Sequence, residues 1–216
     1  RHKTDSRDME GLLHTAPTQL QFTEDDNDRG YQYLTSVGFE KGDKFVCLVV
    51  RDNRYLKQIH AERDWSYHDF RDTNIEDYKQ AAVALAKQGY WVFRMGKAVD
   101  KSFETDHPYV IDYANTTERS DFLDLWLMAN CFYAISTGLG LDSVADVFRR
   151  PIVFVNYVPL MDLEAWGPYI TVPKKLTWTA TNRPLSLSEQ VKHTSLNGHH
   201  YCDNGISVHD MKPDEI

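Results

Sequence analysis

Cysteine is scarce in this sequence, which contains three in 216 residues. Cys47, Cys131 and Cys202 are widely separated and form no Cys-x-x-Cys pair, so neither a disulfide framework nor a cysteine-based zinc site is expected. Long apolar runs are also lacking, and none approaches the roughly 20 residues of a membrane-spanning helix. These absences favour a protein of the reducing cytoplasm that does not cross a bilayer.

Positive charge is the second shortage. The 24 Lys and Arg residues are outnumbered by 32 Asp and Glu, the formal net charge is −8, and no run of Lys and Arg exceeds two residues. The basic patches that bind nucleic acid are therefore not expected. A local basic pocket for a phosphorylated small molecule is compatible with this composition.

The hydrophobic content of 42% is sufficient for a buried core, and one domain is the default for this length. Residues 1–21 are polar and aperiodic, and we expect a leader or linker there; residues 22–216 are expected to form the domain. The chain begins with Arg1 and ends on a helix-like segment at residues 212–216. We therefore expect a piece of a longer protein, with an N-terminal partner domain outside it.

Apolar runs rich in β-branched residues alternate with amphipathic segments along most of the chain. This alternation predicts right-handed βαβ units and a parallel sheet flanked by helices, an α/β, Rossmann-like fold. In chain order the expected elements are helix 22–39, strand 44–50, helix 74–87, strand 90–95, strand 109–113, helix 120–130, strand 131–136, helix 141–148, strand 151–158, edge strand 170–176, helix 186–193 and strand 205–210.

Residues 134–155 concentrate small hydroxyls and glycines where one of these strands meets a helix. In parallel sheets, ligands bind at the carboxyl ends of the strands, and glycines there let the backbone approach an anion. The alternative is a tight turn with a helix cap, and the segment matches neither the P-loop nor a GxGxxG motif. The candidate donor-binding residues of this segment are Ser136, Thr137, Gly138, Gly140, Asp142 and Ser143.

Two other strand ends carry polar residues. Arg51 and Asp52 follow the first strand, and an arginine there can offer a planar fork to a phosphate; a solvated Arg–Asp pair is the alternative. Arg94 lies at the end of the second strand, and Gly96 follows it. Three such strand ends predict one shared cleft.

The remaining candidates lie in loops and at one helix start. His68 and Asp69 occupy an aromatic, charged loop at residues 64–72 that is typical of a pocket wall or lid. Asp112, Tyr113 and Asp121 precede or begin the helix at 120–130, where Ser120 or Asp121 is also a candidate cap. The histidines near the C-terminus match no zinc spacing, so no metal is expected there.

Ordered blocks along residues 20–216 resemble a bacterial glycosyltransferase family of surface-polysaccharide loci, itself assigned mostly by similarity. The blocks that carry the resemblance include FTEDDNDRGYQYL (22–34), FVCLVVRDNRYLK (45–57), GYWVFRMGK (89–97), ISTGLGLD (135–142) and NGISVHDMKPDEI (204–216). The resemblance implies the Rossmann-like donor-binding half of a GT-B glycosyltransferase. It also implies a nucleotide-sugar donor, a glycan or lipid-linked glycan acceptor, and cytoplasmic assembly with peripheral membrane association.

More distantly, VCLVVRD resembles the His-x-Arg strand of fucosyltransferase-like enzymes. Arg51 matches the arginine, which would neutralise the departing diphosphate, whereas Val49 stands in place of the histidine. Asp52 and Asp69 are the candidate bases. No cofactor is expected, and the reaction is expected to be metal-independent. Two alternatives stay open: a polysaccharide pyruvyltransferase, which uses a related frame, and a noncatalytic nucleotide- or glycan-binding module.

Overall fold

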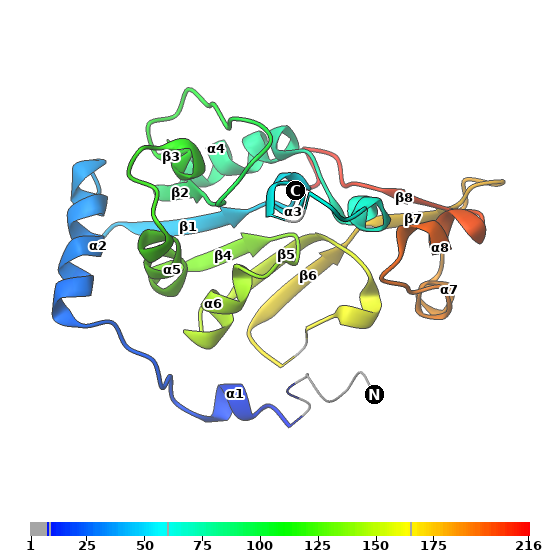
Figure 1. Ribbon diagram of the computed structural model, residues 1–216, viewed down its shortest axis with the longest axis horizontal. Coiled ribbons are helices and arrows are strands. Elements are labelled where there is room, and N and C mark those ends of the chain that lie inside the picture. The colour runs from blue at the N-terminus through cyan, green and yellow to red at the C-terminus, as the bar shows by residue number, and fades with distance from the viewer. Residues whose placement is uncertain (1–7, 9, 60, 165) are drawn as a thin grey trace.

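The fold is organised around one six-stranded parallel sheet (Figure 1). The structure is a computed structural model that describes residues 8, 10–59, 61–164 and 166–216. The strand order is β3-β2-β1-β4-β5-β6, and every neighbouring pair is parallel, which confirms the sequence prediction. The strands are β1 (Lys44–Val49), β2 (Tyr90–Arg94), β3 (Val110–Ile111), β4 (Tyr133–Ser136), β5 (Ile152–Tyr157) and β6 (Tyr169–Pro173).

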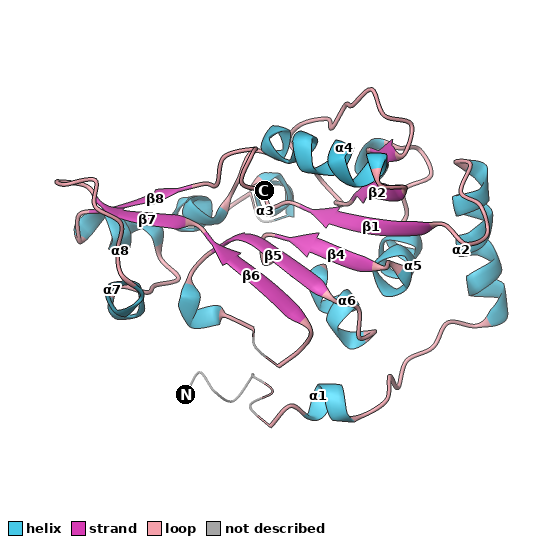
Figure 2. Ribbon diagram, turned by 180° about the vertical axis from the view of Figure 1, so that it is seen from behind, coloured by secondary structure: helices cyan, strands magenta, loops and turns pink. Residues whose placement is uncertain are grey.

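Helices cover both faces of this sheet, and Figures 1 and 2 show α4 on one side with α5 and α6 on the other. The covering helices are α2 (Glu24–Ser36), α4 (Lys79–Lys87), α5 (Asp121–Asn130) and α6 (Asp142–Val147). Shorter helical turns lie in the connections: α1 (Leu12–Thr15), α3 (Arg54–Ile59), η2 (Ser66–Arg71), η3 (Ile75–Tyr78), η4 (Tyr113–Asn115) and η5 (Leu160–Asp162). None of the helices in the described ranges is both long and apolar enough to span a bilayer.

The alternation of side chains along β1 produces the two cores. Phe45, Cys47 and Val49 pack with α2, α5 and α6, whereas Val46 and Leu48 pack with α4 on the opposite face. Successive residues of a strand point to opposite faces, so a strand covered on both sides needs a continuous apolar run. The β1 sequence is such a run, and this is why it occupies the middle of the sheet.

A second, smaller unit extends beyond the carboxyl ends of β5 and β6. It pairs β7 (Lys175–Trp178) antiparallel with β8 (Ile206–His209) and includes α7 (Leu187–Lys192) and α8 (Gly198–Asp203). The expected strand at 170–176 is thus divided at Lys174 between the two sheets. The expected strand at 109–113 is also shorter than predicted, because only Val110 and Ile111 pair with β2.

Helix starts agree closely with the sequence. Thr23 and Ser186 each form a capping box, and Ser120 accepts a hydrogen bond from the backbone N–H of Leu123. Side-chain oxygens at these positions satisfy backbone donors that the first helical turn leaves free. The caps therefore fix where α2, α5 and α7 begin.

The packing of α2 against α5 can be tested by substitution of Gly30. A Cβ on Gly30 would lie 2.1 Å from Cε2 of Trp126, which is fully buried. Although alanine favours a helix by about 1 kcal/mol over glycine, we expect Gly30→Ala to lower the free energy of unfolding by about 1–3 kcal/mol. Urea unfolding measures this, with Gln32→Ala on the exposed side of α2 as the control. A Gly30→Ala protein as stable as the wild type would contradict the packing described.

Candidate functional site

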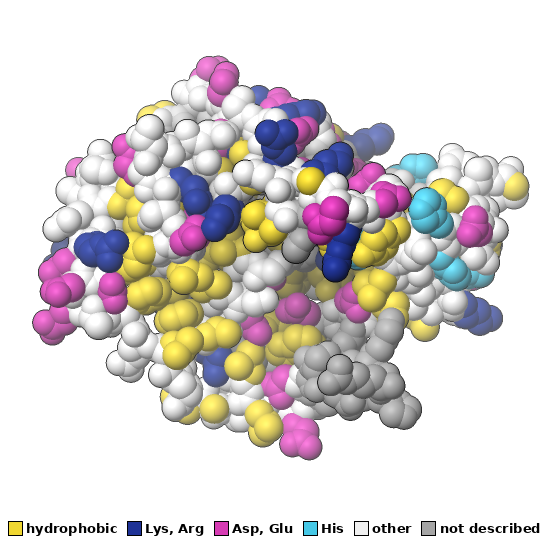
Figure 3. Space-filling model, viewed as in Figure 1, with side chains coloured by type: hydrophobic (Ala, Val, Ile, Leu, Met, Phe, Trp, Pro, Cys, Tyr) yellow, Lys and Arg dark blue, Asp and Glu magenta, His cyan; other side chains and the backbone are white. Residues whose placement is uncertain are grey.

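The carboxyl edge of the sheet holds a cleft of about 530 Å³. It lies at the point where the strand order reverses between β1 and β4, which is where ligands bind in open parallel sheets. The loops after β1, β2 and β4 and the first turn of α5 line it, and aliphatic side chains form most of its wall. Figure 3 shows hydrophobic side chains gathered across the middle of the face that carries α5 and α6. The expected shared cleft is therefore present.

The loop after β4 uses most of its polar groups to hold its own shape. The Ser136 hydroxyl donates to Asp142 Oδ2 at 2.6 Å and accepts from the Gly138 N–H at 3.1 Å, while Asp142 also accepts from the Leu139 N–H at 2.8 Å. Asp142 is buried, and burial raises the pKa of its carboxyl. These side chains brace the loop from inside rather than facing a ligand.

The other candidates of this loop also differ in whether they line the cleft. Thr137 is buried, and its hydroxyl accepts from the Arg51 N–H at 2.9 Å. Gly138 has a φ of 82°, and Ser143 is exposed outside the lining of the cleft. Gly140 alone among the six candidates lines the cleft. The sequence located the loop correctly, but it could not tell internal bracing from ligand contact.

Arg94 and Tyr113 lie in the interior and not in the cleft, contrary to the sequence-based expectation. Arg94 is 1% exposed, and its Nη1 lies 3.0 Å from Asp112 Oδ1. Alternation along β2 turns Arg94 toward the α4 face, whereas Met95 faces the cleft. Tyr113 is fully buried and exchanges hydrogen bonds with the backbone of Ser120.

Asp112 is the partner of Arg94 and braces the loops around it. Its Oδ2 also accepts from the Phe103 N–H at 2.8 Å and from Asn115 Nδ2 at 2.7 Å. Asp112 does not line the cleft. An ion pair with buried Arg94 and these hydrogen bonds account for all the contacts seen at this carboxylate.

Gly96 and Asp121 do line the cleft. A Cβ on Gly96 would lie 2.5 Å from the Val99 side chain, so this turn admits no larger residue. Asp121 lies 2.9 Å from Lys97 Nζ and 2.6 Å from Arg119 Nη2. The charge at this wall is therefore already paired within the protein.

Arg51 and Asp52 occupy the end of β1, as expected, and both line the cleft. The Arg51 side chain is 13% exposed, and its Nε lies 3.0 Å from Asp72 Oδ1. Asp52 accepts backbone N–H groups at both oxygens, from Arg54 at 2.9 Å and from Asp100 at 3.1 Å. These bonds fix the Asp52 carboxylate between the two loops.

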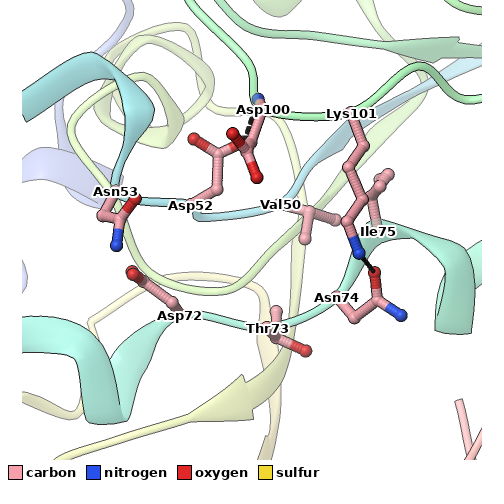
Figure 4. A pocket seen from close by; sticks show the side chains of 9 residues that line it. All are labelled: Val50, Asp52, Asn53, Asp72, Thr73, Asn74, Ile75, Asp100 and Lys101. Atoms are coloured by element: carbon pink, nitrogen blue, oxygen red, sulfur yellow. Dashed lines mark hydrogen bonds between the residues drawn. The ribbon is translucent and has the colours of Figure 1, made fainter. Parts of the chain in front are cut away.

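A smaller polar pocket of about 190 Å³ adjoins the other side of residues 50–53 (Figure 4). Asp52, Asp72 and Asp100 line it from three different loops. Burial, with added repulsion from Asp69 and Asp52, raises the pKa of Asp72 to about 6 against the opposing charge of Arg51. A carboxyl that gains a proton near neutral pH is suited to acid–base chemistry.

Three residues missed by the sequence reasoning line the polar pocket or contact the residues around it. Arg71 Nη2 donates to the Gly138 carbonyl at 2.7 Å, and Asp72 faces Arg51. Buried Lys174 donates to the Asp72 carbonyl at 2.7 Å and pairs with Asp210 at 2.6 Å. The sequence analysis singled out the loop at residues 64–72, which contains Arg71 and Asp72, but it did not name these two residues. No local pattern indicated Lys174. Asp69 itself is exposed, with its Oδ1 3.5 Å from Asn53 Nδ2.

No metal centre is assembled by the part of the chain that the structure describes, in which no three His, Cys, Asp or Glu side chains are placed to share an ion. The sequence does contain one Asp-x-Asp triplet, at residues 26–28, in the first turns of α2. Asp26 there closes the capping box with Thr23, and Asn27 accepts from Trp126 Nε1 at 3.1 Å. This triplet serves helix packing and lies outside the cleft lining.

Comparison with known proteins gives two similar solved structures. No protein-family model and no curated protein matches the chain. The Escherichia coli ADP-heptose LPS heptosyltransferase II is 13% identical, with a TM-score of 0.47 over 86% of this chain and 51% of that one. The Thermosulfurimonas dismutans KpsC β-Kdo 2,4-transferase is 10% identical, with a TM-score of 0.38 over 84% of this chain and 66% of that one. The chain thus spans about half of the first protein and about two thirds of the second.

Asp72 provides a pH test of the site. Its pKa is higher in the folded protein than the ordinary 3.8, so its stabilising contribution is complete below pH 3.8 and is lost as the pH rises through about 6. Between pH 4 and pH 7 we expect the wild type to lose about 2 kcal/mol relative to Asp72→Asn. Urea unfolding at several pH values measures the difference, and parallel curves for the two proteins would refute it.

Gly138 and Gly140 lie in the same loop but differ in the space around them, so their alanine variants can be compared directly. A Cβ on Gly138 would meet Tyr157 Cε2 at 2.8 Å at a positive φ, whereas a Cβ on Gly140 would meet no atom within 4 Å. We expect Gly138→Ala to lower the free energy of unfolding by about 1–2 kcal/mol and Gly140→Ala to change it by less than about 0.5 kcal/mol. Thermal and urea unfolding of both variants check this. Equal losses would show that the loop is not held as described.

Proposed function

We propose that this chain is the donor-binding part of a GT-B-like glycosyltransferase that moves a sugar from a nucleotide-sugar to a glycan acceptor. The observation that carries the proposal is the position of Arg51, which lies at the end of β1 and lines a cleft at the reversal point of a parallel sheet. The cleft volume of about 530 Å³ is within the range of small-molecule sites. Its aliphatic wall suits a nucleobase, and its arginine suits a phosphate.

Sugar transfer is favoured by a positive charge beside the leaving diphosphate. When the bond between the anomeric carbon and the diphosphate oxygen breaks, its electron pair stays on the diphosphate, which gains negative charge. A preorganised guanidinium stabilises this charge most where water is largely excluded. Arg51 meets this condition because its side chain is 13% exposed and its backbone N–H is fixed by Thr137.

The acceptor hydroxyl must lose a proton as it attacks. Asp52 and Asp69 remain candidates for this step, and the structure adds Asp72, whose pKa of about 6 is close to the operating pH of most enzymes. Asp72 opens into the polar pocket beside Asp52, next to the cleft. We assign the base role to Asp72 first because it lines the polar pocket beside the cleft and its pKa is raised to about 6.

The acceptor is a glycan or a lipid-linked glycan of surface-polysaccharide assembly, handled on the cytoplasmic side with peripheral membrane association. Its site would be completed by a partner domain outside this sequence. Val49 is 1% exposed and lines the cleft, where its apolar side chain supplies neither a charge nor a hydrogen-bonding group. Arg51 therefore acts in this proposal without that histidine.

The test is a thermal-shift panel of UDP-, GDP-, dTDP- and CMP-linked sugars on the wild type and Arg51→Gln. We expect one nucleotide class to stabilise the wild type, with binding at least about tenfold weaker in Arg51→Gln because a charge-assisted hydrogen bond is lost. Arg63→Gln is the matched control, since Arg63 is exposed and carries the same charge. Calorimetry on the selected donor then gives the affinities.

Two outcomes separate the alternatives. Stabilisation by a phosphorylated pyruvyl donor and by no nucleotide-sugar would identify a pyruvyltransferase. Donor binding without hydrolysis or transfer, in the full-length protein as well, would identify a binding module. If no donor of either kind shifts the melting temperature, the proposed function fails.

A further inference from the structure

A separate cavity of about 360 Å³ lies between the second, smaller unit and the loops of the main sheet. It is called the outer pocket below, and its volume is within the range of small-molecule sites. Its wall comes from η2, from η5 and from the segment between α7 and α8, and consists of Tyr67, Met161, Thr194, Ser195, Leu196 and Asn197. None of these residues lines the cleft or the polar pocket, so the outer pocket is a distinct site.

The outer pocket also differs from the other two in its chemistry. No charged side chain is among the described residues of its wall, whereas Arg51 and Asp52 line the cleft. The wall combines the aromatic Tyr67 and the apolar Met161 and Leu196 with two hydroxyls and one amide. It offers no charge to balance a phosphate, and it suits a neutral ligand with an apolar surface and many hydroxyls. A sugar ring has this composition, because its C–H bonds form an apolar face and its hydroxyls form the rim.

Buried contacts hold the wall in place. Tyr201 is 1% exposed, and its hydroxyl accepts from the Ser195 N–H and donates to the Ser195 carbonyl, both at 3.2 Å. The Met161 N–H donates to the Thr194 hydroxyl at 3.1 Å. A Cβ on Gly198 would lie 2.9 Å from a side chain of η2, so the segment between α7 and α8 fits closely against that turn. A preformed wall of this kind needs little ordering when a ligand binds.

Two polar groups of the wall are left to bind a ligand. Asn197 Oδ1 accepts from the His199 N–H at 3.0 Å, which orients the amide and leaves Nδ2 without a partner among the described residues. Ser195 Oγ accepts from the Asn197 N–H at 3.1 Å, and its own proton can be donated. The Tyr67 ring is held by the His68 ring, with the two centroids 4.1 Å apart. An aromatic face attracts the polarised C–H bonds of a sugar, while the amide and the hydroxyl donate to its oxygens.

The outer pocket lies at the same edge of the sheet as the cleft. η2 is tied to the loop after β4 by Arg71 Nη2, which donates to the Gly138 carbonyl at 2.7 Å. η5 is tied to β5 by the Tyr157 hydroxyl, which donates to the Asp162 carbonyl, and the Tyr157 ring packs beside Gly138. Figures 1 and 2 show α7 and α8 beyond the carboxyl end of β6. A ligand that occupies both cavities must be longer than one sugar, because they share no lining residue.

We propose that the outer pocket binds an internal sugar of the acceptor glycan while the terminal sugar of that glycan reaches the cleft. This inference rests on the proposed function and narrows its acceptor to an oligosaccharide, free or lipid-linked, that is uncharged at the sugar held here. Tyr67 packs against the face of this sugar, and Asn197 Nδ2 and Ser195 Oγ donate to its oxygens.

The first test is an amide NMR titration of the chain with short neutral oligosaccharides of glucose, galactose or N-acetylglucosamine. We expect at least one series to bind the wild type, and to bind Tyr67→Leu about fivefold to tenfold more weakly because the aromatic face is lost. Tyr109→Leu is the matched control and should bind as the wild type does, since Tyr109 is an exposed tyrosine outside all three cavities. Asn197→Asp keeps an oxygen for the His199 N–H and loses the Nδ2 donor, so it should fold normally and bind about fivefold more weakly.

A second readout needs no variant. The bound oligosaccharide should shift the amide signals of Ser195 and Asn197 in the wild type. Equal affinity of the wild type, Tyr67→Leu and Asn197→Asp would overturn the proposal, as would the absence of binding by every oligosaccharide series. Shifts at Ser195 and Asn197 with uridine or guanosine, and with no oligosaccharide, would identify a nucleobase pocket and refute the glycan site.

The outcomes also distinguish this inference from the proposed function. If oligosaccharides bind through Tyr67 but the full-length protein binds no nucleotide-sugar and transfers no sugar, the glycan site stands and the glycosyltransferase function fails. If the full-length protein transfers sugar and Tyr67→Leu leaves the KM for its acceptor unchanged, the function stands and the outer pocket is not an acceptor site.

Discussion

Burial of β1 on both faces is the constraint on which the rest of this structure depends. The strand lies between the layer of α4 and the layer of α2, α5 and α6, and its residues alternate between two separate cores. Because its neighbours β2 and β4 are both parallel to it, the loops that follow all three strands meet at one edge. The cleft is a consequence of this arrangement, since the strand order reverses beside β1.

The same edge is stabilised largely by polar groups that face inward. Ser136 and Asp142 brace the loop after β4, and Arg94 with Asp112 braces the loops around β3. Buried polar groups cost free energy unless they are paired, so these pairs hold the loops in one conformation. Rigid loops in turn leave Arg51, Gly96 and Gly140 in fixed positions along the cleft wall.

The pairing around Arg71 resembles that of the other charged groups at this edge. Arg94, Arg119 and Asp124 also keep one buried atom without a hydrogen-bond partner among the described residues, although each is ion-paired through another atom. Around Arg71 two guanidinium groups repel each other, and the adjacent Asp72 is held toward its neutral form. Low exposure strengthens each of these interactions, because water does not screen them.

The sequence by itself determined the order of strands and helices along the chain and the strand ends where a ligand could bind. These features depend on local periodicity and on the backbone needs of helix starts, which neighbouring residues encode. Only the tertiary structure decided which polar residues reach the cleft. The side chain of Arg94 faces the interior and not the cleft, because its position on β2 places it on the side of Asp112. Lys174 is distant in sequence from Asp72, yet it donates to the Asp72 carbonyl and pairs with Asp210. The physical reason is that side-chain partners are chosen by contacts across the fold, which no local pattern contains.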